Sequence, residues 1–279
     1  MTLTFPHQLD RVRDVVLAQQ AKLERVAGLY ADALQSGGLV HVYANGHSRI
    51  AAEETIVRMG ALTGFHPLLT PGLVTFDSVV GTRGIRINQR MERVEGVGAA
   101  ILDEFDLGPH DVFLVLSATG TTPAAVDLAL EAQRRYPAHP LVVIACEAQA
   151  RTAAAKHSSG KTLAPVVDAA RVGVFLDNAM PVGDLTVTVE GETGHYEVCP
   201  LSSIGALTVV QSLNELTVRE LDRRGHPHHV LRNMHLHETG DSYGAWVRDQ
   251  RARYARALHR GPVGASPPAA DRPEPTRRP

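Results

Sequence analysis

The sequence predicts an α/β fold in which helices cover both faces of a parallel sheet. Four short apolar runs are typical of strands buried on both sides, at residues 39–44, 112–116, 141–146 and 172–176. Segments with helical patterns lie between such runs, and strands that alternate with helices favour a doubly wound parallel sheet. A chain of 279 residues is long enough to bury such a core.

A single long amphipathic helix is expected at the start of the chain. Apolar residues recur at helical spacing from Gln8 to Gln35, and Gly37-Gly38 ends the pattern. We therefore expect residues 1–38 to form a helix that packs on the core of the domain.

The first strand, Leu39–Ala44, leads into a tight loop and a second helix. The loop is Asn45-Gly46-His47-Ser48, and a helical pattern then runs from Arg49 to Leu62. Open α/β sheets bind ligands beyond the carboxyl ends of their strands, so this loop is expected at the ligand-binding edge.

The loop after the next buried strand carries four hydroxyl groups. Ser117-Ala118-Thr119-Gly120-Thr121-Thr122 follows the strand Val112–Leu116 and precedes a helix from Pro123 to Tyr136. Free amides and the positive end of the helix dipole then face outward, the hydroxyls add donors, and Gly120 lets backbone approach a ligand closely. Together these features predict a phosphate site, whereas one Ser or Thr alone would only cap a helix.

The last third of the chain is expected to add an edge strand, a helix and a tail. Leu185–Glu190 predicts an edge strand with Tyr196–Cys199 paired beside it, and Ser202–Arg224 has apolar residues on one helical face. Gly261–Pro279 is rich in proline and has no aromatic residue, which predicts a disordered tail. Residues 39–260 then form a single domain.

Composition and motifs exclude several classes of protein. A formal net charge of −2 gives no field that would attract nucleic acid. Neither Cys146 nor Cys199 has metal-ligand spacing, so we expect no disulfide framework, no metal or cofactor, and a reduced, cytoplasmic location. Met1–Asp10 lacks signal-peptide features, and no apolar run reaches the ~18 residues needed to span a membrane. A G-x-G-x-x-G turn and a Walker motif are also absent, which disfavours NAD and ATP.

The two loops together resemble the sugar isomerase (SIS) domain, which binds phosphosugars. The usual Ser-x-Ser-Gly-x-Thr loop of that domain has its third position filled by Thr119 here, which keeps the hydroxyl. From about Leu9 to about Arg224 the chain is similar to an uncharacterised bacterial SIS family of single-domain phosphosugar-binding proteins. The motifs that carry this closer similarity are Gly46-His47-Ser48, Glu53-Glu54, Glu92-Arg93-Val94-Glu95-Gly96, His157-Ser158-Ser159-Gly160-Lys161 and Asp177-Asn178-Ala179-Met180-Pro181-Val182-Gly183-Asp184.

The resemblance implies a three-layer αβα sandwich with a five-stranded parallel sheet in flavodoxin-like order. It also implies a phosphorylated sugar as substrate and a homodimer or homotetramer with active sites at subunit boundaries. The residues expected to bind the phosphate are Gly46, His47, Ser48, Ser117, Ala118, Thr119, Gly120, Thr121 and Thr122.

Glutamate and histidine are the candidate catalytic residues, because isomerisation through an enediol needs a base and an acid. One of Glu53 and Glu54 can point back at a bound sugar, or both can be acids favoured by the helix dipole. Glu95 precedes a glycine, as in a segment that supplies a catalytic acid or base in SIS etherases. Alternatively, Glu92 and Glu95 form a solvated or salt-bridged face of one helix.

His157 and Lys161 lie in a polar loop that is expected on the ligand side of the sheet. His157 can open the sugar ring and Lys161 can meet a phosphate or hydroxyl, or both can simply fix the loop. Five histidines between His226 and His237 fit no metalloprotease motif, which favours a surface or subunit-contact segment, with His237 as a weak candidate for a neighbouring site. Turn chemistry accounts for Asp184.

The leading hypothesis is therefore a phosphosugar aldose–ketose isomerase that uses a Glu base and a His acid or base. An SIS-type lyase or etherase and a non-catalytic phosphosugar sensor are the alternatives. The segment before the first strand has no basic recognition helix, which disfavours a direct repressor.

Overall fold

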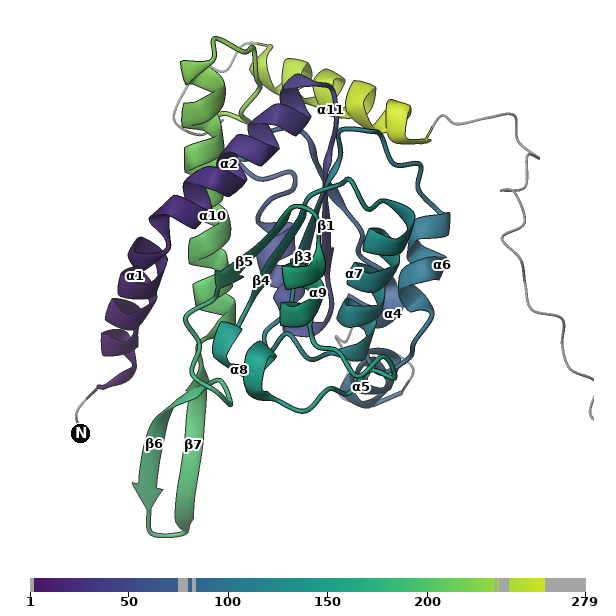
Figure 1. Cartoon of the computed structure of the whole chain (residues 1–279). Coiled ribbons are helices and arrows are strands. Elements are labelled where there is room, and N and C mark those ends of the chain that lie inside the picture. The colour runs from purple at the N-terminus through teal and green to yellow at the C-terminus, as the bar shows by residue number, and fades with distance from the viewer. Residues whose placement is uncertain (1–2, 75–79, 82–83, 234, 236–240, 259–279) are drawn as a thin grey trace, which may run out of the picture.

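The centre of the molecule is a five-stranded parallel sheet with the order β2-β1-β3-β4-β5 (Figure 1). The computed structural model describes residues 3–74, 80–81, 84–233, 235 and 241–258. This flavodoxin-like order confirms the predicted fold class, and the strand order reverses between β1 and β3. The strands are Val40–Ala44 (β1), Phe65–Pro67 (β2), Val112–Leu116 (β3), Leu141–Ala145 (β4) and Gly173–Asp177 (β5).

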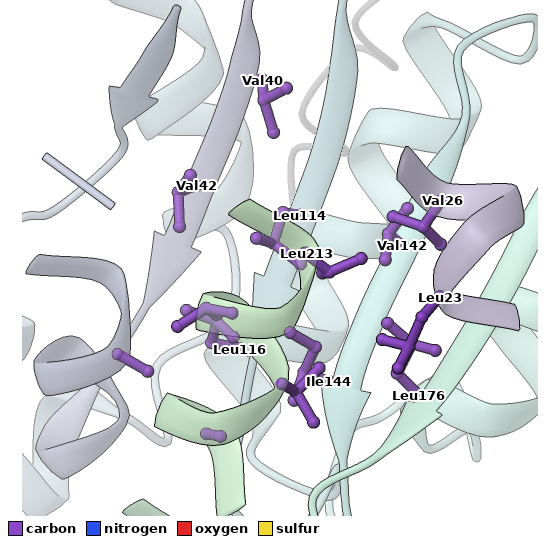
Figure 2. Close-up of a cluster of buried hydrophobic side chains, with 14 of the residues drawn as sticks. Leu23, Val26, Val40, Val42, Leu114, Leu116, Val142, Ile144, Leu176 and Leu213 are labelled. Atoms are coloured by element: carbon purple, nitrogen blue, oxygen red, sulfur yellow. The ribbon is translucent and has the colours of Figure 1, made fainter. Parts of the chain in front are cut away.

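One face of the sheet is covered by α2 (Gln20–Gln35) and α10 (Ser202–Arg223). Alternate residues of each strand point toward this face, because successive side chains of a strand lie on opposite sides of the sheet. Figure 2 shows the apolar side chains that meet between these layers: Leu23, Val26, Val40, Val42, Leu114, Leu116, Val142, Ile144, Leu176 and Leu213.

The opposite face of the sheet is covered by α6 (Val97–Asp103), α7 (Pro123–Arg135) and α9 (Leu163–Ala169). The remaining strand side chains pack there, and they include Tyr43, Phe113, Val115, Val143 and Phe175. The two helical layers and the sheet make up the three-layer αβα sandwich.

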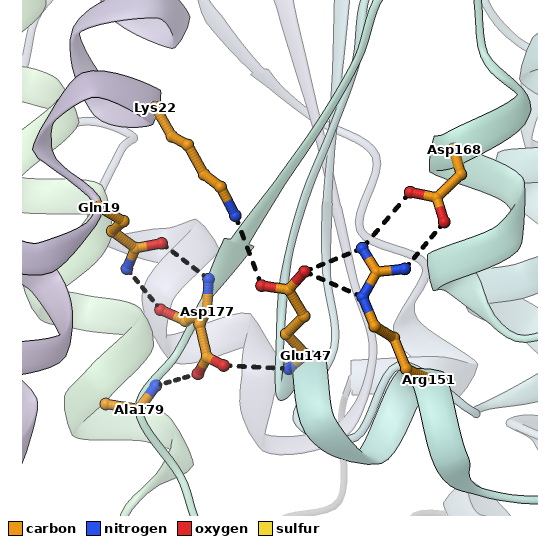
Figure 3. Close-up of polar contacts among 7 residues, drawn as sticks. All are labelled: Gln19, Lys22, Glu147, Arg151, Asp168, Asp177 and Ala179. Carbon is orange, nitrogen blue, oxygen red and sulfur yellow. Dashed lines mark hydrogen bonds and ion pairs between the residues drawn. The ribbon is translucent and has the colours of Figure 1, made fainter.

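The prediction of one continuous N-terminal helix is wrong. The chain forms α1 (Gln8–Ala18) and α2, which are separated by the buried residue Gln19. Gln19 Nε2 donates to the backbone oxygen of Asp177 at 2.8 Å, and the backbone nitrogen of Asp177 donates to Gln19 Oε1 at 2.9 Å (Figure 3). Since β5 is the outer strand of the sheet, this side-chain amide takes the place of a neighbouring strand.

The helix expected from Arg49 to Leu62 ends early. Helix α3 spans only Arg49–Glu53, and just beyond it the Thr55 hydroxyl donates to the carbonyl of Ala52 at 2.7 Å. Val57 then adopts a φ of 46°, in the left-handed region where a right-handed helix cannot continue. The chain turns back to form β2, an edge strand of three residues that the sequence pattern does not predict.

The expectation of an edge strand at Leu185–Glu190 is also wrong. β6 (Leu185–Gly191) and β7 (Gly194–Pro200) pair with each other, as predicted, but they form a separate antiparallel hairpin that projects from the body (Figure 1). At its base Asp184 and Cys199 have φ values of 71° and 65°. These left-handed residues turn the backbone sharply where the ribbon leaves the domain.

The helix predicted at Ser202–Arg224 is confirmed as α10, whereas α11 (Ser242–Leu258) has no counterpart in the sequence prediction. Trp246 of α11 is buried, and its indole Nε1 donates to the carbonyl of Ala61 at 3.2 Å.

Among the described residues no helix combines the length and apolarity needed to cross a bilayer. The predicted tail, Gly261–Pro279, lies outside the described part of the chain. The remaining helices are η1 (Phe5–His7), η2 (Gly46–Ser48), α4 (Pro71–Val74), α5 (Ile85–Met91) and α8 (Glu147–Thr152).

Candidate functional site

A cavity of about 370 Å³ opens at the carboxyl ends of β1 and β3. The strand order of the sheet reverses between these two strands, which is where open α/β sheets bind ligands. Four segments build its wall: the loops that follow the two strands, helix α5, and the junction between the hairpin and α10.

The loop after β1 contributes Asn45, Gly46, His47 and Ser48 to the cavity. Gly46 has a φ of 55°, and a Cβ atom there would lie 2.6 Å from Glu92 Oε1. Glycine therefore lets the loop pass close to this carboxylate. The side chain of Asn45 is buried, and within the described residues its Nδ2 atom has no hydrogen-bond partner. Such a buried, unused donor is uncommon and marks a place where a ligand can bind.

The loop after β3 is held in shape by its own hydroxyl groups. Ser117 Oγ accepts a hydrogen bond from the backbone nitrogen of Gly120 at 3.0 Å, and Thr119 Oγ1 lies 2.9 Å from Thr121 Oγ1. Of residues 117–122, all except Gly120 and Thr121 line the cavity. The loop is thus preorganised, and it presents hydroxyls to the cavity as the sequence predicts.

The N-terminus of α7 faces the same cavity. The helix begins at Pro123, and the hydroxyl of the preceding residue, Thr122, lines the cavity without capping the helix. A helix of 13 residues carries partial positive charge at this end. The free amides that the sequence predicts are not found at the first helical residues, because Pro123 has no N–H and the nitrogens of Ala124 and Ala125 donate to the carbonyls of Glu92 and Thr122. What this helix start offers an anion is therefore its dipole.

Glu92 brings a carboxylate to the cavity. It follows Met91, the last residue of α5, and its backbone oxygen accepts a hydrogen bond from the Ala124 nitrogen at 3.0 Å, which fixes it against α7. Burial raises the pKa of Glu92 above its ordinary value, and the charge of Arg93 opposes only part of this rise. A half-buried carboxylate with a raised pKa is suited to proton transfer near neutral pH.

The structure separates Glu92 from Glu95. The expectation that one helix carries both is wrong, because α5 ends at Met91 and α6 begins only at Val97. Glu95 instead accepts hydrogen bonds from the backbone nitrogen of Ser158 at 2.7 Å and from its hydroxyl. These two bonds hold the pKa of Glu95 below its ordinary value.

His157 and Glu95 form a cluster that does not line the cavity. His157 Nε2 lies 3.7 Å from Glu95 Oε2 and 3.7 Å from Asp127 Oδ1, and it has no hydrogen-bond partner among the described residues. Lys161, exposed in the same loop, does not line the cavity either. The structure therefore brings two of the predicted catalytic residues together, but outside the cavity that the loop after β3 lines.

Glu53 and Glu54 also lie outside the cavity lining. Glu53 is exposed, with Oε1 3.9 Å from Arg49 Nε. Glu54 Oε2 forms an ion pair with Arg58 Nε at 2.6 Å and accepts a hydrogen bond from Gln211 Nε2 at 3.1 Å, so its carboxylate faces α10.

The last wall of the cavity comes from residues that the sequence does not single out as ligand-binding. Asp184 Oδ1 accepts hydrogen bonds from the backbone nitrogens of Leu201, at 2.9 Å, and Ser202, at 2.7 Å. Its carboxylate thereby caps the start of α10, where Ser202 and Ser203 line the cavity. Pro200 of β7 and the α5 residues Asn88 and Gln89 complete this side. The one sequence signal that could have indicated this wall is the pair of adjacent serines, Ser202 and Ser203, at the start of a predicted helix.

The histidine-rich segment does not form a metal site in the described part of the chain. No group of three or more His, Cys, Asp or Glu side chains in the described ranges is arranged to hold a metal ion. His228 Nδ1 lies 2.9 Å from the backbone oxygen of His226. His237, the weak candidate for a neighbouring site, falls outside the described residues.

Comparison with known proteins identifies the family of the chain. Residues 5–143 match the family described as the SIS domain. A UPF0309 protein from Listeria monocytogenes is 30% identical over 256 residues, which cover 90% of this chain and 97% of the relative. A UPF0309 protein from Streptomyces coelicolor is 28% identical over 242 residues, or 87% of this chain and 90% of the relative. The chain therefore belongs to the UPF0309 family of SIS-domain proteins.

Solved structures with a similar chain course are more distant. A phosphoheptose isomerase from Francisella tularensis aligns with a TM-score of 0.45 and 15% sequence identity, over 77% of this chain and 94% of that one. A phosphoheptose isomerase from Neisseria gonorrhoeae aligns with a TM-score of 0.44 and 12% identity, over 77% and 95%.

Proposed function

We propose that this protein binds a phosphorylated sugar in the cavity between β1 and β3 and interconverts its aldose and ketose forms. Membership of the SIS domain family supports the phosphosugar as ligand. The observation that carries the proposal is the meeting of two hydroxyl-bearing loops and a half-buried carboxylate, Glu92, in one cavity.

The phosphate is held between residues 46–48 and residues 117–122 in this proposal. The hydroxyls of Ser48, Thr119 and Thr122 line the cavity and can donate to phosphate oxygens. The α7 dipole adds to the attraction. Hydrogen bonds to an ionised phosphate are stronger than neutral ones, so three hydroxyls are enough to fix the position of the ligand.

Glu92 acts as the base in this proposal. Aldose–ketose conversion removes a proton from the carbon next to the carbonyl and returns it to the neighbouring carbon through an enediol, so one carboxylate can carry the proton in both steps. Because its pKa is raised, the Glu92 carboxylate can hold the proton between the two steps. We place the base here because Glu53, Glu54 and Glu95 do not line the cavity.

A histidine is available for the acid step. His47 lines the cavity beside Gly46 and can act on the ring oxygen or the carbonyl oxygen of the sugar. His157, which the sequence predicts for this role, lies in the cluster with Glu95, so His47 replaces it in the proposal.

Turnover of a panel of sugar phosphates tests the function. Pentose, hexose, heptose and amino-sugar phosphates are incubated with the protein in deuterium oxide and followed by proton NMR. We expect a keto product and deuterium at C2 for at least one of them. Glu92→Gln should then lower kcat by about 10²- to 10⁴-fold while the sugar phosphate still binds. Glu215→Gln is the matched control, because Glu215 is exposed and paired with Arg219 on the outside of α10.

Two outcomes would contradict the isomerase. Tight binding without turnover across the panel would leave a phosphosugar binder. Deuterium at C2 with loss of a leaving group would indicate elimination instead of isomerisation.

A further inference from the structure

The outer edge of β5 is open along part of its length. β5 is the last strand in the sheet order, and no strand in the described part of the chain pairs with its far side. Backbone polar groups of alternate residues point to opposite edges of a strand. Val172 and Asn178 bond with β4, so the N–H and C=O groups of Gly173, Phe175 and Asp177 point to the open edge.

One position on this edge already binds an amide group as it would bind a strand. Gln19 Nε2 donates to the oxygen of Asp177, and the nitrogen of Asp177 donates to Gln19 Oε1 (Figure 3). A neighbouring strand makes the same two kinds of bond with its peptide groups. No side chain in the described ranges does this for Gly173 or Phe175.

A cavity of about 450 Å³ lies along this stretch of the edge and is mainly basic. The β5 residues Gly173, Val174 and Phe175 line it. Four basic and two acidic side chains complete the charged part of its wall, from α2, α8 and the region of α9: Lys22, Arg25, Arg151, Arg171, Glu147 and Asp168. This local excess of positive charge contrasts with the formal net charge of −2 for the whole chain.

Two of the four basic side chains are available to a ligand. Arg151 forms ion pairs with both acids of the cavity, Glu147 and Asp168, at 2.8 Å (Figure 3). Arg25 and Arg171 are exposed, and neither forms an ion pair or a side-chain hydrogen bond with any residue that the structure describes. Their two guanidinium groups therefore lack carboxylate partners beside an open strand edge.

We propose that an extended, acidic segment of a partner protein binds here by adding a strand to β5. A strand supplies both the acceptors and the donors that the backbone groups of Gly173 and Phe175 need, whereas an inorganic anion would leave the two carbonyls unmatched. Carboxylates of the segment would pair with Arg25 and Arg171. Charged side chains beside an edge discourage pairing with strands in general, so these arginines select an acidic one.

The ion pair between Lys22 and Glu147 joins the two walls of this cavity but can open. Its atoms lie 3.4 Å apart, and the Lys22 side chain is 48% exposed. An ion pair with this exposure adds little to stability, so a carboxylate of the incoming segment can replace Glu147 as the partner of Lys22. The cavity shares no lining residue with the one between β1 and β3, so this proposal does not depend on the proposed function.

Fluorescence anisotropy with the full chain tests the role of the arginines. The probe is a short fluorescein-labelled peptide in which glutamate alternates with threonine, and we expect saturable binding to the wild type. Arg25→Gln/Arg171→Gln should raise the dissociation constant at least about 10-fold. Arg219→Gln/Arg223→Gln is the matched control, because it removes two exposed arginines of α10 and should leave the affinity nearly unchanged. No binding to the wild type, or equal weakening in the two double variants, overturns the proposal.

A methylated peptide tests whether the segment pairs as a strand. The same peptide with every backbone nitrogen methylated keeps its carboxylates but cannot donate hydrogen bonds, so it should bind at least about 10-fold more weakly. Hydrogen exchange of the Gly173 amide, followed by NMR, should slow when the unmethylated peptide binds. Equal affinity of the two peptides, or an unchanged exchange rate at saturation, contradicts strand addition. Protection of this amide in the free chain that is lost on dilution would assign the edge to a second copy and would also overturn the proposal.

Discussion

The two ends of the parallel sheet both carry buried polar side chains but use them in opposite ways. At the amino end, the fully buried His41 has Nε2 2.9 Å from Asp111 Oδ2 and Nδ1 3.0 Å from His66 Nδ1. Asp111 also accepts hydrogen bonds from the backbone nitrogens of Leu39, at 2.8 Å, and Gly108, at 2.5 Å. Within this network of His41, His66 and Asp111, each of these atoms has a partner.

At the carboxyl end, three polar side chains beside the cavity are in a different state. Asn45 Nδ2 has no partner among the described residues, the Thr122 hydroxyl does not cap its helix, and Glu92 is half-buried with a raised pKa. The satisfied polar groups of this network stabilise the fold, whereas in the proposed function the unsatisfied ones beside the cavity bind the ligand. Substitutions at the amino end should therefore change the free energy of unfolding, and those at the carboxyl end should change ligand affinity or turnover.

Removal of Asp111 should have the largest effect on stability. Asp111→Ala leaves His41 Nε2, the buried Leu39 amide and the half-buried Gly108 amide without an acceptor, so we expect the free energy of unfolding to fall by about 3–5 kcal/mol in urea denaturation. Asp32→Ala is the matched control, because that carboxylate forms an exposed ion pair with Arg224 and should cost less than about 1 kcal/mol. If both variants lost the same free energy of unfolding, the buried network at the amino end would not be the source of stability.

Acid should destabilise the amino end through His66. Burial, with the help of the His41 charge, lowers the pKa of His66 to about 4, compared with an ordinary value of 6.5. Between these two values the unfolded chain binds a proton that the folded chain does not. The free energy of unfolding should therefore fall as the pH drops from 6.5 to 4, by up to about 3 kcal/mol, and this contribution stays constant above pH 6.5.

Urea denaturation across this pH range checks the assignment. In His66→Gln the side chain can still hydrogen-bond to His41 but does not titrate, so the dependence on pH should be shallower than in the wild type. Parallel curves for the two proteins would show that His66 is not responsible.

The sheet and the hydroxyl-bearing loop after β3 can be predicted from the sequence because local patterns determine them. Continuous apolar runs indicate four of the five strands, and a loop rich in hydroxyls after Leu116 indicates the cavity wall. β2 escapes prediction because three residues, one of them Pro67, are too few to show a pattern. The alternation of apolar and polar residues reveals the pairing within the hairpin, but its departure from the sheet depends on the left-handed backbone of Asp184 and Cys199.

The choice among the glutamates could not be made from the sequence. A helical pattern places Glu92 and Glu95 on one face, yet α5 ends at Met91, and the backbone oxygen of Glu92 accepts a hydrogen bond from the Ala124 nitrogen instead of continuing the helix. That contact joins segments about 30 residues apart in the chain. Likewise Glu54 faces α10 because α3 is short, and only the folded chain shows this.

Calorimetric titration with a sugar phosphate tests most directly whether the cavity captures the phosphate. The wild type should bind a phosphorylated sugar from the panel but not the same sugar without its phosphate. Loss of one hydroxyl in Thr119→Ala should weaken binding about 10- to 100-fold, while Thr119→Ser should retain the affinity because it keeps the hydroxyl. Equal binding of the sugar with and without phosphate, or an unchanged dissociation constant for Thr119→Ala, would contradict the account.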